Sequence, residues 1–133
     1  MNATYKPFFL SYALFLLLAV VFLLCLAFLH NANLSAYVGA AVSFLPYVAA
    51  TLCAAYLGYA APTRVWLQLV ALGCCVAVGF GLVNLAHEIF IGPADFSGLT
   101  GSAFVVAMSF PVVLLLCFLG GGVGVGVRRA KHA

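Results

Sequence analysis

The chain has 133 residues, of which 68% are hydrophobic and only 5% are charged. A soluble domain carries about 25% charged residues, and a soluble chain this poor in charge would expose large apolar patches and aggregate. The net charge of +3 is too small to indicate a nucleic-acid-binding protein. The composition therefore predicts an integral membrane protein that has the lipid bilayer as its solvent.

Four apolar runs follow one another along the chain, and each can cross a hydrocarbon core of about 30 Å. We predict helices over residues 8–29, 36–60, 65–86 and 103–127. The first run is longer than the apolar part of a signal peptide and no cleavage site follows it, so we expect it to be retained. The predicted fold is an all-α membrane protein, a single domain over 1–133 with four transmembrane helices in an up-down bundle.

The basic residues predict the orientation of this bundle. All five lie at the N-terminus, in the turn between the second and third runs, or in the C-terminal tail 128–133: Lys6, Arg64, Arg128, Arg129 and Lys131. The other two connections contain no Lys or Arg. Because basic residues favour the cytoplasmic side, we expect a multi-pass protein with both termini in the cytoplasm, in a bacterial inner membrane.

Small residues predict how the helices pack, because membrane helices associate through close contact of small side chains. At or near four-residue spacing, the second run carries Gly39, Ser43, Ala50, Ala54 and Gly58, and the third carries Gly73, Ala77 and Gly81. The fourth run ends in a glycine-rich segment, and the first is bulky. We expect the last three helices to approach one another closely and the first to lie more against lipid, although the small face of the third could also serve self-association.

Two prolines fall within the predicted spans, Pro46 and Pro111, and each removes a backbone hydrogen bond and can kink its helix. Their surroundings are similar: each follows Phe and a nearby Ser, and each precedes a cysteine by six or seven residues. This similarity suggests an internal repeat of two hairpins, as found in transporters. Chance is the alternative, because proline is frequent in membrane helices.

The predicted spans contain no Asp, Glu, His, Lys or Arg, which argues against a proton relay built on buried charge. The five cysteines lie in apolar runs and suit packing rather than redox chemistry. We therefore assign no catalytic residue, no metal ligand and no cofactor, and expect that the protein is not an enzyme.

The predicted outer loop, residues 87–102, holds the most conspicuous polar group. His87, Glu88 and Asp95 lie there with Phe96. His with carboxylates can bind zinc or act in acid–base catalysis, but no fixed spacing supports either here. We favour a polar helix end, and we name these four residues as the candidate partner-binding loop because loops often carry function.

Three functional hypotheses follow. The first is an accessory protein that binds another membrane protein or itself, for which bacteriocin immunity proteins of similar size and helix count offer an analogy only. The second is an oligomeric transporter or channel for a neutral or weakly polar solute, supported by the two prolines. The third, a membrane enzyme, is supported only by the outer polar group.

Overall fold

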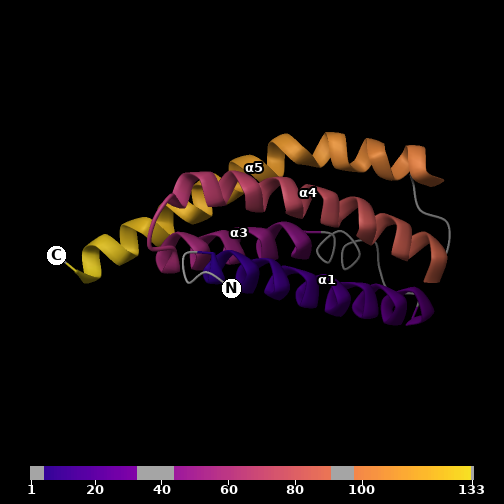
Figure 1. Cartoon of the computed structure of the whole chain (residues 1–133). Helices are drawn as coiled ribbons and strands as arrows, with labels where there is room; N and C mark the ends of the chain where they lie inside the picture. Colours follow the sequence, from indigo (N-terminus) through magenta and orange to yellow (C-terminus); the bar gives the residue numbers. More distant parts are fainter. Residues whose placement is uncertain (1–4, 33–43, 91–97, 133) are drawn as a thin grey trace.

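The computed structural model describes residues 5–32, 44–90 and 98–132, and residues 1–4, 33–43, 91–97 and 133 lie outside the description. Within the described ranges every regular element is an α-helix. The helices are α1 (Lys6–Ala32), α3 (Leu45–Ala60), α4 (Val65–Phe90) and α5 (Gly98–Lys131). Figure 1 shows them lying side by side along a common direction. The predicted all-helical class is confirmed.

Three of these helices, α1, α4 and α5, are long and apolar enough to cross a membrane. The fourth, α3, is equally apolar in character but has only 16 residues. An apolar segment surrounded by lipid has no water to bond its backbone. It favours a helix because a helix makes these hydrogen bonds within the segment. These properties are compatible with a multi-pass membrane protein.

The described part of the second predicted helix begins later than expected. We predicted a helix from residue 36, whereas α3 begins at Leu45 and Phe44 is its N-cap. Pro46 therefore lies in the first turn of α3, where proline is tolerated because the missing N–H has no intrahelical partner. It marks the start of the described helix rather than a kink within it. Gly39 and Ser43 lie outside the described residues.

The other helices are longer than the apolar runs that predicted them. α4 continues to Phe90 and α5 begins at Gly98, so both ends of the predicted loop 87–102 are helical. Likewise α5 continues through Arg128 and Arg129, which we had placed in a tail. Hydropathy detects only the apolar part of a helix, whereas a helical backbone can continue into polar surroundings. Pro111 lies inside α5, as predicted for a proline within the span.

The four helices differ in how extensively they pack against one another. α5 packs extensively against both α3 and α4, whereas α1 packs less extensively on the other side of α3 and α4 and does not contact α5. Figure 1 shows α1 and α5 on opposite sides of the assembly. The α3–α5 contacts pair Thr51 with Gly120 and Ala55 with Gly124, so these two helices run in the same direction.

Small residues allow the closest approaches. A Cβ added to Gly58 would lie 2.9 Å from the Cα of Gly121, and one added to Gly73 would lie 2.9 Å from a methyl of Leu114. Ala50, Ala54 and Ala77 are buried at the centre of the molecule. Helix packing in lipid depends on such contacts, because apolar side chains gain nothing by leaving lipid for one another.

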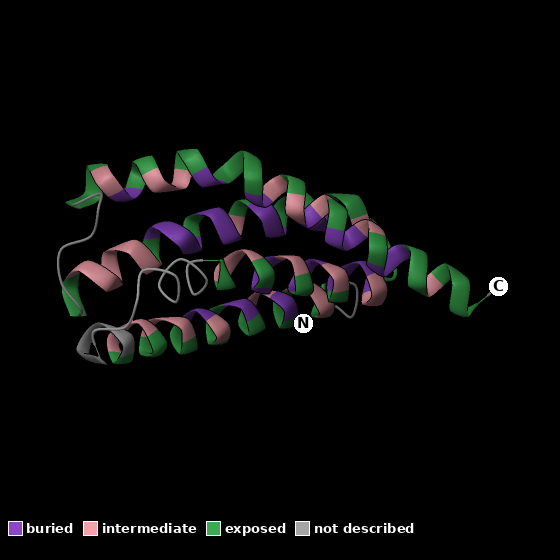
Figure 2. Cartoon of the chain, turned by 180° about the vertical axis from the view of Figure 1, so that it is seen from behind, coloured by how far each residue is buried: buried purple, intermediate pink, exposed green. Residues whose placement is uncertain are grey.

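The interior is filled by side chains from all four helices. Its fully buried larger members are Phe15 of α1, Leu57 and Cys53 of α3, Leu69, Leu72 and Val76 of α4, and Val113 and Cys117 of α5. In α1 only Ser11, Phe15 and Ala19 are buried among the described side chains, and Figure 2 shows the outward face of this helix as exposed. The surface of α1 is therefore largely unpartnered within the chain.

Candidate functional site

One residue of the predicted outer loop, Glu88, caps the N-terminus of α5. The backbone N–H of Gly98, the first residue of α5, donates a hydrogen bond of 2.8 Å to Oε2 of Glu88 near the end of α4. Gly98 has a φ of +72°, which an L side chain rarely adopts. A carboxylate at a helix N-terminus satisfies an unpaired N–H and interacts favourably with the helix dipole. Glu88 thus joins α4 to α5 at this end.

A second interhelical contact lies close to this cap. Nδ2 of Asn84 donates to Oγ of Ser102 at 3.0 Å, which connects α4 and α5 through two polar side chains. One turn away, a Cβ on Gly81 would lie 3.3 Å from the carbonyl oxygen of Ser102, so the two backbones are close. The sequence does not indicate this contact, because Asn84 lies in the predicted helix 65–86 and Ser102 in the predicted loop 87–102.

The other residues of the predicted partner-binding loop are not gathered into a site. His87 is half-buried on α4, and its Nδ1 is buried without a hydrogen-bond partner among the described residues. Asp95 and Phe96 lie outside the described residues. Across the part of the chain that is described, no group of three His, Cys, Asp or Glu side chains is placed to hold a metal ion.

The opposite end of the molecule, which we call the basic end, carries Lys6, Arg64, Arg128, Arg129 and Lys131. Here the guanidinium of Arg128 donates a hydrogen bond to the backbone carbonyl of Ala61, the C-cap of α3. Nζ of Lys131 donates to the hydroxyl of Tyr59 at 3.0 Å and lies 5.8 Å from the centre of that ring. The last turns of α5 are thereby attached to the end of α3.

The turn between α3 and α4 is also ordered by side-chain contacts. Nε2 of Gln68, a buried residue in the first turns of α4, donates to the carbonyl oxygen of Thr63 at 3.0 Å. Arg64 in this turn has a φ of +50°, which is uncommon for any residue except glycine. Its side chain is exposed. This turn and the end of α5 together form the polar surface of the basic end.

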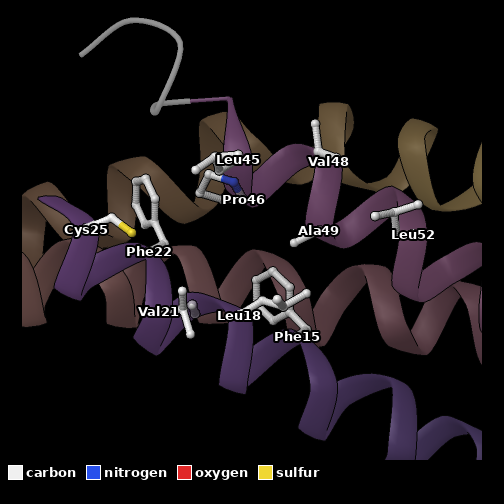
Figure 3. Close-up of a pocket in the computed structure, with 11 residues that line it drawn as sticks. Phe15, Leu18, Val21, Phe22, Cys25, Leu45, Pro46, Val48, Ala49 and Leu52 are labelled. Atoms are coloured by element: carbon white, nitrogen blue, oxygen red, sulfur yellow. The ribbon is translucent and has the colours of Figure 1, made fainter. Parts of the chain in front are cut away.

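An apolar groove runs between α1 and α3. Its volume is about 270 Å³, and Figure 3 shows Phe22 and Cys25 of α1 facing Leu45 and Pro46 of α3 across it. Its other lining residues are also apolar: Phe15, Leu18, Ala19, Val21, Val48, Ala49 and Leu52. A groove without polar groups offers no means of fixing the orientation of a polar solute.

The glycine-rich end of α5 presents two different faces. Gly120, Gly121 and Gly124 are buried against α3 and α4. Gly122 and Gly126 have no atom of another segment within 4 Å of an added Cβ, so they face open space. These two residues are four apart, on one face of the helix. They form the outward glycine pair, a place where a further helix can approach the backbone of α5.

Comparisons with models of protein families, with curated proteins and with solved structures found no match for this chain.

Proposed function

We propose that this chain is a four-helix transmembrane protein, with an up-down topology and both termini in the cytoplasm, that acts as an accessory protein by binding a helix of another membrane protein. Three long apolar helices and a shorter fourth support the membrane assignment. The basic end supports the orientation, because every Lys and Arg of the chain belongs to it.

The observation that carries the binding role is the outward glycine pair. Close approach of helices in lipid requires small residues at the contact, and the other glycines of this segment are already used against α3 and α4. Gly122 and Gly126 keep the same capacity on a face that the chain leaves open. A partner helix that crosses here meets two positions of α5 that carry no side chain.

The interior supports a non-enzymatic role. The described interior holds apolar side chains and a few hydroxyl and amide groups, with the charged residues confined to the two ends. The Glu88 carboxylate, the strongest candidate for chemistry in the sequence, caps α5. An interaction partner therefore explains the molecule better than a reaction does.

The test is affinity purification of the tagged chain from its native membranes in a mild detergent. We expect one membrane protein to copurify in fixed stoichiometry and to be lost when Gly122→Leu and Gly126→Leu are combined. The control combines Phe110→Leu and Val127→Leu, which change exposed side chains on a different face of α5. Equal recovery of the partner with both variants would refute the assigned face.

The second candidate is an oligomeric transporter or channel for a neutral or weakly polar solute, and Pro111 inside α5 is the observation that favours it. A proline within a membrane helix leaves a carbonyl free and provides a point of bending. Purification of a homo-oligomer without a partner, together with solute flux in reconstituted vesicles, would replace the accessory role with this one.

A further inference from the structure

We propose that the basic end binds the headgroups of anionic phospholipids on a platform formed by Arg64, Arg128, Arg129 and Lys131. This inference rests on the transmembrane orientation proposed above, because a headgroup layer must lie at this level of the molecule. It adds a lipid of defined charge to the partners of the protein.

Two of the four side chains, those of Arg128 and Lys131, hold the platform together through hydrogen bonds within the chain. Arg128 donates to the carbonyl of Ala61, and Lys131 donates to the hydroxyl of Tyr59. Both acceptors belong to the end of α3, so the last turns of α5 are held beside the turn that connects α3 to α4. The platform is thus composed of two segments that are far apart in the sequence.

The other two side chains are available to a ligand. Arg64 and Arg129 are exposed, and Arg64 lies in the turn whose Ala61 carbonyl accepts the hydrogen bond from Arg128. The left-handed backbone of Arg64 is costly for a residue with a Cβ, and such conformations are concentrated at functional positions. Arginine is suited to phosphate because its guanidinium can make two parallel hydrogen bonds to phosphate oxygens.

In the described parts of the chain, no carboxylate side chain lies beside the platform. Glu88 is the only carboxylate side chain among the described residues, and it lies at the opposite end, where it caps α5. An anionic headgroup would supply negative charge that no described side chain places beside the platform. A basic residue near an anionic membrane surface contributes about fivefold in affinity, the equivalent of about 1 kcal/mol.

The surroundings favour a lipid over a free anion. Trp66 lies two residues after Arg64, is about half exposed, and packs against Phe118 of α5 with ring centres 6.0 Å apart. Val127, beside Arg128, is also exposed. A phospholipid can place its headgroup on the platform and its chains against this apolar surface, whereas inorganic phosphate gains only the first contact. Tryptophan is also the aromatic residue typical of the membrane interface.

The test uses Trp66, the single tryptophan of the chain. The full-length protein is reconstituted into vesicles of phosphatidylcholine and phosphatidylglycerol, with the acyl chains of one or the other lipid brominated so that neighbouring lipids quench the fluorescence. We expect brominated phosphatidylglycerol to quench Trp66 fluorescence more strongly than its mole fraction in the vesicle predicts. High salt should weaken this preference. Combining Arg64→Gln with Arg129→Gln should lower the relative binding constant by about fivefold for each charge.

Lys6→Gln is the matched control, because it removes one basic charge from α1, which does not contact α5. Its effect on the lipid preference should be smaller than that of Arg64→Gln or Arg129→Gln alone. Equal quenching by both brominated lipids, or an unchanged preference in the double variant, would overturn the platform. Loss of the preference on adding inorganic phosphate, but not chloride at equal ionic strength, would show a free-anion site instead. Absence of quenching by either lipid would mean that Trp66 is outside a bilayer, and would overturn the transmembrane proposal itself.

Discussion

Gly124 provides the sharpest test of the α3–α5 interface. A Cβ at this position would lie 2.8 Å from the backbone nitrogen of Tyr59 and 2.9 Å from the carbonyl carbon of Ala55. Ordinary contacts between heavy atoms lie at about 3.5–4.0 Å, so Gly124→Ala requires α3 and α5 to separate by roughly 1 Å. Backbone atoms of a helix cannot rotate away as a side chain does.

The expected magnitude follows from two opposing effects. Overpacking of this kind typically lowers the free energy of unfolding by about 1–3 kcal/mol. Alanine has a higher helix propensity than glycine, by up to about 1 kcal/mol, which offsets part of the loss. Gly126→Ala makes the same chemical change two residues away, where no atom of another segment lies within 4 Å. The difference between the two variants should therefore be about 1–3 kcal/mol.

The assay is equilibrium unfolding of each variant in mixed detergent micelles, with helical circular dichroism and Trp66 fluorescence as probes. Gly126→Ala should be as stable as the unmodified chain or more stable, and Gly124→Ala should be less stable than Gly126→Ala. Equal stability within about 0.5 kcal/mol, well below the expected overpacking cost, would show that the backbones are not in contact at Gly124.

Two further predictions concern the Glu88 end of the α4–α5 pair. A double-mutant cycle with Asn84→Ala and Ser102→Ala should give a coupling of roughly 0.6 kcal/mol in unfolding free energy, and additive effects would contradict the hydrogen bond between these residues. Glu88→Gln keeps an acceptor for the Gly98 N–H but removes the charge, and should destabilise by about 0.3–1 kcal/mol. That loss should shrink in high salt, and a loss that salt does not change would indicate a different role for the carboxylate.

The helical class could be predicted because long charge-free runs allow few other structures. The helix ends could not be predicted in the same way. The apolar run ends at Ala86, but the helix continues to Phe90 and reaches the position from which Glu88 caps Gly98. That cap depends on the geometry of two helices together, and no local pattern indicates it.

The sequence predicts only part of the candidate site, because the contacts of its residues also depend on how the helices are arranged. The glycine-rich end of α5 was recognised as a packing segment, but its sequence does not distinguish Gly124, which contacts α3, from Gly126, which faces open space. The contact between Arg128 and Ala61 joins residues 67 positions apart, and nothing local to either of them indicates it. Basic residues at the end of a run predict orientation, whereas their contacts depend on the tertiary arrangement.

The position of α5 has a consequence for how such a protein is made. Synthesis proceeds from α1 to α5, yet the two largest interfaces are those of α5 with α3 and α4, and the smallest is between α3 and α4. In a bilayer, α3 and α4 would insert with the surfaces that face α5 still covered by lipid, and they share few contacts with each other. If the chain spans a bilayer as proposed, the bundle completes its packing only after α5 has entered. A chain truncated before Gly98 would leave α3 and α4 without their main packing partner.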